Sequence, residues 1–244
     1  MTEPVSPGAF AKALIEQRER AKRRKLILWG SVGGAVILVA ALVIVSFFTP
    51  AFATKQVAVS GQSLLTEGQV LDAARVEMGV PLPRQDRGAI AARVRELAPV
   101  QDVRVELGWP TTLEIDVTER KLAYQLQRNA GHFDWVDESG AVFHSTAKAE
   151  PGAVVATVEE TDDETRLLRD VATVVNALPE AIRSDVQTVK AKAVDQITLS
   201  LSEKRTVVWG SAEESTLKAE VLAALLSVEA RTYDVSAPQL PTTK

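Results

Sequence analysis

The sequence contains no cysteine, two histidines and few aromatic residues, which make up 5% of the chain. Without cysteine there is no disulfide bond, no thiolate zinc site and no cysteine nucleophile. His132 and His144 are the only imidazoles, which leaves little for a histidine-based metal site. Any function of this chain must therefore be built from other residue types.

An excess of positive charge is also missing. Across 244 residues, 28 lysines and arginines oppose 32 aspartates and glutamates, so the net charge is −4. This balance excludes a generally basic nucleic-acid-binding protein. Hydrophobic residues make up 46% and charged residues 25% of the chain, as in globular proteins, so wholesale disorder is excluded too.

The basic residues gather at the start of the chain. Residues 1–25 hold seven lysines and arginines and three glutamates, so they carry +4, and the rest of the chain carries −8. Residues 26–48 follow without a single charge. As a helix they would be about 35 Å long, enough to cross a hydrocarbon core of about 30 Å.

We therefore predict an uncleaved anchor over residues 26–48. A cleaved signal peptide is the alternative, because Ala51-Phe52-Ala53 resembles a cleavage site. However, the apolar region of a signal peptide runs to only about 7–15 residues. By the positive-inside rule, the tail of residues 1–25 lies in the cytoplasm and the residues from about 49 onward lie outside. The same rule accounts for the basic run as a signal for membrane orientation, so binding to nucleic acid is not needed to explain it.

The first exported segment, residues 54–121, is predicted to have the order β-α-α-β-β. Alternating apolar residues predict strands at 56–60, 102–107 and 113–117. A capping box that starts at Thr66 opens the first helix, which Gly79 is expected to end, and Asp86 is expected to cap the second. Two helices on one face of a three-stranded sheet would bury the apolar faces of both layers.

The second exported segment, residues 122–238, is predicted to be a mixed β-rich domain with two helices, so the fold class is α+β. Its strands are predicted at 122–127, 132–136, 141–144, 154–156, 186–191, 196–201, 205–209 and 232–236. Capping boxes at 161–164 and 211–214 open the helices. Pro238 and Pro241 keep the final edge strand short, and residues 239–244 are expected to be a loose tail.

No catalytic or cofactor-binding pattern holds together in this sequence. A Ser-His-Asp set would need His132 or His144, and neither lies near a nucleophile elbow. There is no phosphate-binding or dinucleotide-binding glycine motif. The acid pairs Glu159-Glu160 and Asp162-Asp163 are adjacent in sequence, and the second lies at a helix start, which favours negative charge. We therefore expect a binding protein with no enzymatic activity, cofactor, metal or small-molecule substrate.

Several motifs, taken in order behind a single span, resemble the FtsQ/DivIB family of bacterial cell-division proteins. The β-α-α-β-β order resembles the polypeptide-transport-associated (POTRA) domain, and the stretch WPTTLEIDVTER at 109–120 is the most specific match. The further matches are VAVSG at 57–61, WVDESGAVF at 135–143, VVWG at 207–210, Lys218 and YDVS at 233–236. The resemblance covers about residues 20–238.

The resemblance implies a non-enzymatic scaffold at the division septum, which links early and late division proteins and recruits the coiled-coil proteins FtsB and FtsL. Its C-terminal edge strand would bind them by strand addition, in which backbone bonds give affinity and alternate side chains give specificity. Carried over by position, the partner-binding residues are Thr232, Tyr233, Asp234, Val235 and Ser236, with Trp209 and Gly210 in the same sheet. Tyr233 is the expected anchor, because aromatic residues dominate interface hot spots.

Other interpretations stay open at this point. Trp209 and Val235 fit an ordinary core equally well. A POTRA-type chaperone or translocation partner for exported chains is a second function, although one POTRA unit on a helical anchor is unusual for it. A membrane-tethered cell-wall hydrolase is a third, and it would need a pocket with perturbed carboxylates.

Overall fold

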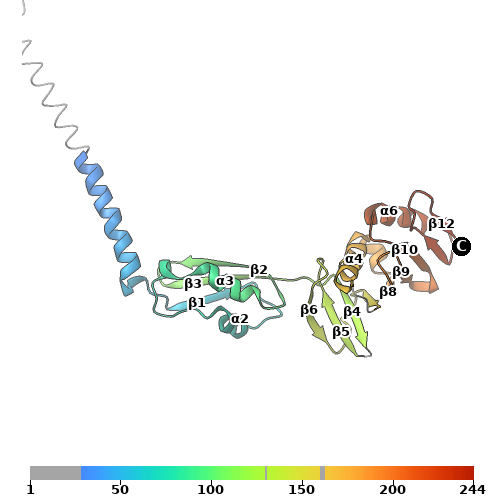
Figure 1. Cartoon of the computed structure of the whole chain (residues 1–244), viewed down its shortest axis with the longest axis horizontal. Coiled ribbons are helices and arrows are strands. Elements are labelled where there is room, and N and C mark those ends of the chain that lie inside the picture. Colours follow the sequence, from blue (N-terminus) through green and yellow to red (C-terminus); the bar gives the residue numbers. More distant parts are fainter. Residues whose placement is uncertain (1–28, 130, 160–162) are drawn as a thin grey trace, which may run out of the picture. The chain divides into compact units, whose positions relative to one another are not determined.

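The computed structural model of the protein describes residues 29–129, 131–159 and 163–244. The tail of residues 1–25 and the first three residues of the expected span lie outside these ranges. The first described element is the helix Trp29–Phe48, whose 20 uncharged and mostly apolar residues make it long enough to cross a membrane (Figure 1). At about 1.5 Å per residue it is about 30 Å long.

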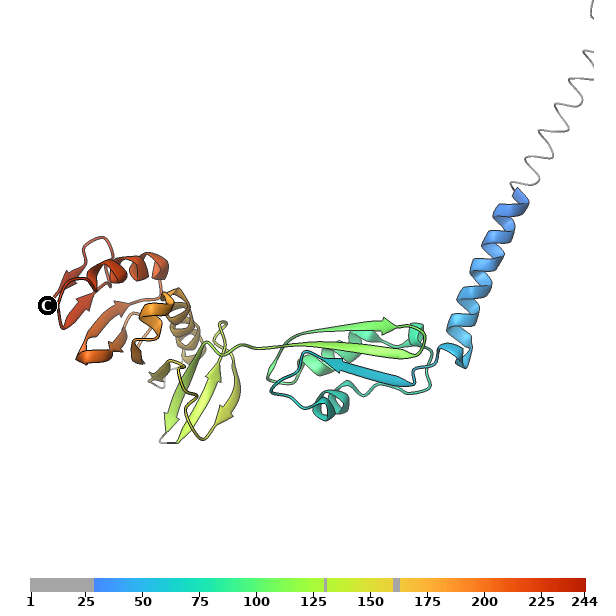
Figure 2. The same cartoon turned by 180° about the vertical axis from the view of Figure 1, so that it is seen from behind.

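The segment after the span folds as expected into a three-stranded sheet with two helices. The sheet has the order β1-β3-β2, and the helices lie together on one side of it (Figure 2). The strands are β1 (Gln56–Ser60), β2 (Val100–Gly108) and β3 (Thr112–Glu119), and the helices are α2 (Glu67–Ala74) and α3 (Arg87–Arg95). Leu113, Ile115 and Val117 of β3 are buried together with Val70 and Val94 of the helices. The β-α-α-β-β prediction is confirmed.

Side-chain caps fix the start of α2. The Thr66 backbone N–H donates to Gln69 Oε1 over 2.9 Å, and the Gln69 N–H donates back to Thr66 Oγ1 over 3.3 Å, so the predicted capping box is present. The prediction that Gly79 ends this helix is wrong. The helix ends at Ala74, because Arg75 adopts a left-handed φ of 47° and Arg93 donates to the Ala74 carbonyl.

The rest of the chain forms one nine-stranded sheet in the order β12-β11-β10-β9-β8-β7-β4-β5-β6. Its first half comprises β4 (Tyr124–Asn129), β5 (His132–Val136), β6 (Val142–Thr146) and β7 (Val155–Val158). Its second half comprises β8 (Val186–Ala191), β9 (Ile197–Leu201), β10 (Thr206–Gly210), β11 (Thr232–Asp234) and β12 (Thr242–Thr243). Parallel pairs join β4 to β7, β7 to β8 and β10 to β11.

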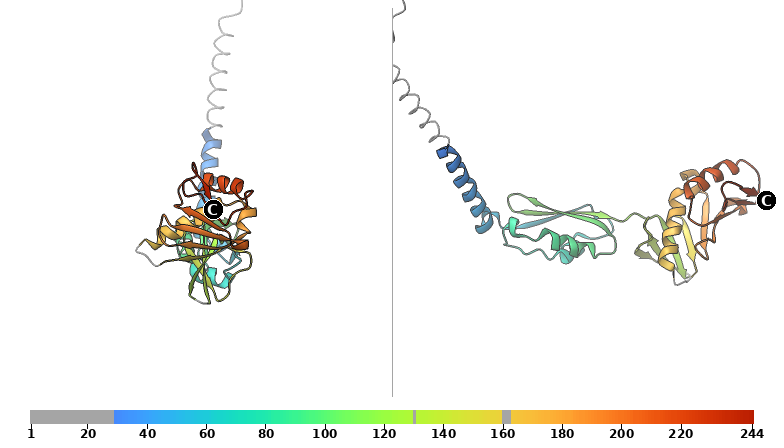
Figure 3. Two further views of the ribbon diagram at one scale, coloured as in Figure 1. Left: turned by 90° about the vertical axis from the view of Figure 1, so that its right-hand side faces the viewer. Right: turned by 45° about the horizontal axis from the view of Figure 1, so that its top comes forward.

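Two helices, α4 (Glu164–Ala177) and α6 (Ser215–Leu225), cover one face of this sheet (Figure 3). A short helix, α5 (Glu180–Arg183), follows α4. The α+β fold class is therefore confirmed. The capping box expected at 211–214 is wrong, because Glu214 precedes α6 with a left-handed φ of 53° and makes no capping bond. The cap expected at 161–164 falls partly outside the described residues.

The opposite face of the sheet carries a row of polar side chains across β8 to β11. Thr188, Ser200, Thr206 and Thr232 lie directly beside one another across β8, β9, β10 and β11, and all four are partly exposed. Since residues that pair across neighbouring strands share a face, they form one hydroxyl row. The residues next to them along each strand, such as Tyr233 after Thr232, point to the helical face.

The C-terminal edge of the sheet differs from the expectation. Residues 242–243, expected to lie in a loose tail, form β12 and pair antiparallel with β11, in the register Tyr233↔Thr243 and Asp234↔Thr242. The strand at 232–236 is therefore covered on its outer side, and the edge itself belongs to β12. Thr242 and Thr243 are both polar and exposed and give no apolar alternation, so the sequence pattern does not reveal this strand.

Candidate partner-binding edge

Strand β11 is the second strand from the C-terminal edge and lies parallel to β10. Val207 pairs with Tyr233 and Val208 with Asp234, and the Val235 N–H donates to the Val208 carbonyl over 3.0 Å. The helix α6 connects the two strands, as a parallel pair requires a crossover. Trp209 and Gly210 on β10 therefore share the sheet with residues 232–236, as expected.

The aromatic residues of this site lie inside the domain. Tyr233 is 1% exposed, and Trp209 and Val235 are fully buried. The Tyr233 hydroxyl donates to the Val228 carbonyl over 2.8 Å, and the Trp209 indole N–H donates to Ser215 Oγ over 3.3 Å. These side chains hold β10 and β11 against the helices, so they do not offer a free surface to a partner.

Gly210 and Ser236 are brought together by the fold. Gly210 has a φ of +78°, and a Cβ built on it would lie 3.0 Å from the Ser236 Cβ. A larger residue at 210 would be strained by its backbone and crowded by Ser236. This close approach gives a physical reason for a glycine before α6 and a small residue after β11.

Lys218 on α6 stabilises the end of β10. It is 2% exposed, and its Nζ donates to the Trp209 carbonyl over 3.1 Å and to the Ser211 carbonyl over 2.8 Å. Burial lowers the pKa of this ammonium below its usual value of 10.5, while Glu213 and Glu214 act in the opposite direction. These two hydrogen bonds to local carbonyls explain why a lysine occupies position 218, one of the positions that resemble the family.

Asp234 ends β11 with an Asx turn. Its Oδ1 accepts hydrogen bonds from the Ser236 N–H over 3.0 Å and the Ser236 hydroxyl over 2.6 Å. The chain then passes buried Pro238 and returns as β12. Thr232 and Lys244 exchange two backbone bonds of 2.9 Å each, so the outer polar groups of β11 are paired within the chain.

The segment that covers β11 is itself held by few contacts. Leu240 is 81% exposed, and the residues from 241 to 244 are all exposed. Beside it lies an open hollow of about 640 Å³, whose lining includes Arg205, Arg231, Tyr233 and Lys244. The edge of the sheet therefore combines a short backbone ladder with a neighbouring cavity.

The described residues bring no catalytic set around the histidines. His132 is exposed at the start of β5, and the His144 ring packs edge-on against Trp135 with 5.0 Å between ring centroids. The same part of the chain holds no group of three or more potential metal-ligating side chains. Burial raises the pKa of Asp170 on α4, but this carboxylate is not among the residues that line the hollow between α4 and α6. Of the acid pairs, Glu160 and Asp162 lie outside the described residues.

The comparisons with known sequences match both folded segments. The sequence model of the FtsQ-type POTRA domain matches residues 52–120, and that of the FtsQ/DivIB C-terminal region matches residues 125–237. The chain belongs to the FtsQ/DivIB family of cell-division proteins.

Curated relatives share this assignment. Cell division protein FtsQ of Streptomyces bingchenggensis is 39% identical over 197 residues, which cover 77% of this chain and 74% of the relative. FtsQ of Streptomyces coelicolor is 37% identical over 77% of this chain and 76% of its own length. FtsQ of Mycolicibacterium smegmatis is 33% identical over 97% of this chain and 70% of its own length.

A solved structure gives a more distant likeness. The major extracytoplasmic domain of the cell division protein DivIB from Geobacillus stearothermophilus is 15% identical and has a TM-score of 0.36. It covers 45% of this chain and 93% of its own. The assignment to the FtsQ/DivIB family does not depend on this likeness.

Proposed function

We propose that this FtsQ-family chain is a non-enzymatic scaffold of the cell-division machinery. Its tail of residues 1–25 lies in the cytoplasm, and its POTRA domain (54–121) and β domain (122–238) lie outside the membrane at the division septum. It recruits small single-span coiled-coil proteins of the FtsB and FtsL kind and so links early to late division proteins. The basic tail before the apolar helix supports this orientation.

The observation that carries the proposal is the C-terminal edge of the nine-stranded sheet. The outward-facing N–H and C=O groups of Thr232 are paired only with Lys244, at the end of a two-residue strand. A partner segment with a longer strand would replace these bonds and add more along β11. Backbone pairing at a sheet edge is an established mode of peptide recognition.

The roles of the predicted residues follow from where their side chains lie. Tyr233 and Val235 are buried, so in this proposal they hold β11 in place while its backbone binds. Thr232 and Asp234 are partly exposed and lie on the polar face, where they would contact alternate side chains of the partner. Gly210 and Trp209 support the strand from β10.

Photo-crosslinking in cells tests the proposal. A photoreactive residue at Thr232 on β11 is compared with one at Thr146 on β6, the strand at the opposite edge of the same sheet. Both threonines are partly exposed, so they form a matched pair. We expect Thr232 to capture a small single-span coiled-coil protein and Thr146 not to. Capture of diverse exported chains at Thr232 would instead support a chaperone.

Deletion of residues 239–244 tests whether the covering segment competes with the partner. This deletion removes β12 but keeps the buried Pro238 and all of β11. If the segment competes, the crosslink yield from Thr232 rises in the shortened chain. A fall in that yield would show that the partner docks on β12 itself and would contradict direct pairing with β11.

A further inference from the structure

Two large apolar side chains are exposed on the described part of the POTRA domain: Trp109 and Met78, with 54% and 55% of their surface accessible. Every other strongly apolar side chain of its three strands and two helices is at least partly buried. Two such residues on one small domain would be unremarkable if they were scattered. Here, both are attached to the same short stretch of chain.

Trp109 lies at the tip of the β2–β3 hairpin and contacts Phe52. The two rings meet edge-on, with 5.4 Å between their centroids. Two residues further along the hairpin, the Thr111 carbonyl accepts hydrogen bonds from the backbone N–H groups of Lys55, over 2.9 Å, and Gln56, over 3.4 Å. The tip is therefore fastened to residues 52–56.

Met78 is attached to the same stretch through its neighbours Gly79 and Val80. The next residue, Gly79, donates its N–H to the Thr54 carbonyl over 2.9 Å. The Thr54 N–H and hydroxyl both donate to the Val80 carbonyl, each over 2.9 Å. We define the apolar base as Phe52, Met78 and Trp109, which come from three separate segments.

The apolar base lies close to the membrane because only a short segment of chain connects it to the membrane helix. The membrane helix ends at Phe48, and Phe52 follows four residues later, at the end of the 3₁₀ turn η1 (Pro50–Phe52). Four residues reach at most about 14 Å even when fully extended, and a 3₁₀ turn rises only about 2 Å per residue. The polar zone of a bilayer leaflet is roughly 5–7 Å deep. This reach holds for every orientation of the domain relative to the helix.

We infer that the apolar base inserts into the lipid interface of the leaflet next to the POTRA domain, as a second membrane contact besides the span. Tryptophan is enriched at that level of the bilayer because its ring is apolar while its N–H can bind polar groups. Insertion would cover the exposed surface of Trp109 and Met78 and would restrict how the domain tilts on its short connection to the helix.

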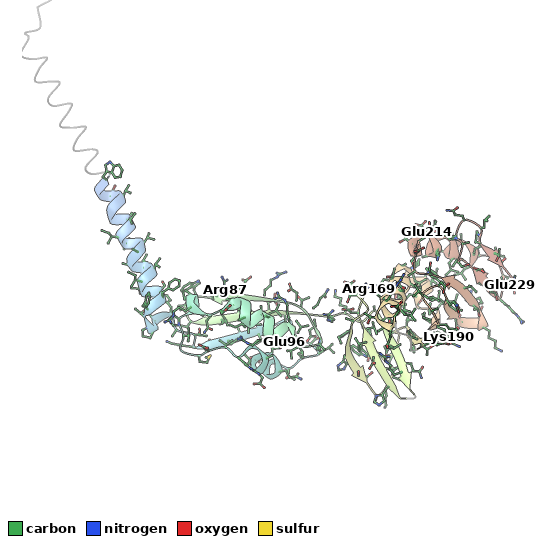
Figure 4. All side chains as sticks on the ribbon, in the orientation of Figure 1. Arg87, Glu96, Arg169, Lys190, Glu214 and Glu229 are labelled. Carbon is green, nitrogen blue, oxygen red and sulfur yellow. The ribbon has the colours of Figure 1, made fainter. Side chains whose placement is uncertain are left out.

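Insertion by the apolar base is distinguishable from attraction by charge. The exposed basic residues Lys55, Arg84 and Arg87 at this end are opposed by Glu77 and Asp86, and Figure 4 shows Arg87 at the beginning of α3. With so small a surplus of positive charge, we expect the contact to persist at high salt and with uncharged lipid headgroups.

The cysteine-free sequence makes the test direct. The full chain is placed in lipid nanodiscs with a single Met78→Cys substitution that carries an environment-sensitive fluorophore. A matched chain carries the same label at Thr118→Cys, exposed near the far end of β3. With nitroxide-bearing lipids, we expect quenching and a blue-shifted emission at position 78 and neither effect at position 118.

Variants at Trp109 complete the test. Trp109→Asp in the Met78-labelled chain should abolish the quenching, whereas Trp109→Phe should retain it, which separates insertion from misfolding. Equal access of aqueous iodide to both labels, with no lipid quenching, would overturn the proposal. Shielding of position 78 in cells but not in nanodiscs would also overturn it, because a protein would then cover the apolar base.

Discussion

The two sheets of this protein are held together by different means. In the POTRA domain, side chains bond directly to the backbone at the ends of the elements: Glu119 binds residues 63–65, and Arg93 binds the end of α2. In the nine-stranded domain, a continuous apolar core between the sheet and the helices α4 and α6 contributes more to stability. A small domain buries too little apolar surface to depend on it alone, so local polar clamps matter more there.

The largest expected effect is in the nine-stranded domain. Trp209→Ala removes a fully buried ring from its core and should lower the free energy of unfolding of that domain by about 3–5 kcal/mol. Trp109→Ala is the matched control, because this tryptophan is 54% exposed. Urea unfolding of the full chain, followed by amide NMR signals from each domain, measures both. Equal losses in the two variants would contradict the comparison.

The next effect concerns Lys218, a buried polar clamp at the partner-binding edge. Lys218→Met keeps most of the side-chain volume but leaves the Trp209 and Ser211 carbonyls without their donor. We expect a loss of about 1–3 kcal/mol, as for unsatisfied buried acceptors. Lys190→Met, on an exposed position of β8, is the control and should change stability little. The same urea titration measures both, and an unchanged midpoint for Lys218→Met would show that water replaces the ammonium.

Glu119 provides the corresponding test in the POTRA domain. Burial opposes its ionisation, but bonds from the Leu64 and Leu65 N–H groups and from Ser63 outweigh this, so its pKa lies below 4.5. Because the folded-state pKa is lowered, its contribution to stability is present above pH 4.5 and is lost as pH falls further. Glu119→Gln should cost about 1–2 kcal/mol at pH 7.

The pH dependence separates this clamp from general acid effects. The difference in urea midpoint between wild type and Glu119→Gln should shrink between pH 7 and pH 3. Glu114→Gln, on an exposed position of the same strand, should follow the wild type throughout. A constant difference across this range would mean that the charge of Glu119 does not contribute, and the comparison between the domains would lose its main support.

The smallest effect is a gain. Glu203 and Lys204 form the β9–β10 turn with φ values of 56° and 61°, a conformation that asparagine and glycine adopt more readily. The double variant Glu203→Asn and Lys204→Gly should raise the free energy of unfolding by about 0.5–1 kcal/mol. Thermal unfolding should show a modest rise in Tm. No change, or a fall, would indicate that these side chains stabilise the turn by other contacts.

The sequence predicted those elements that have one buried face. Strict alternation of Leu113, Ile115 and Val117 identified β3, and regular spacing of Val171, Val174 and Leu178 identified α4. Family motifs then placed both domains in order. The pattern reflects burial, so it works where burial alternates with exposure.

The sequence could not predict features that depend on partners distant in the chain. β12 buries no side chain and exists only because β11 offers it a backbone ladder. At the start of α6, Ser211 has the spacing of a cap, but the helix begins only at Ser215, after Glu214 in a left-handed conformation. Tyr233 suggested an interface anchor because it is aromatic, and only the fold shows that it points inward.

The hydroxyl row has a consequence for how this domain can associate. Thr188, Ser200, Thr206 and Thr232 keep the row itself hydrated, so it offers no apolar strip on which a second sheet could stack. The opposite face is already covered by α4 and α6. In the proposed function, a partner strand at the C-terminal edge would therefore pair through backbone groups and would not stack on this row.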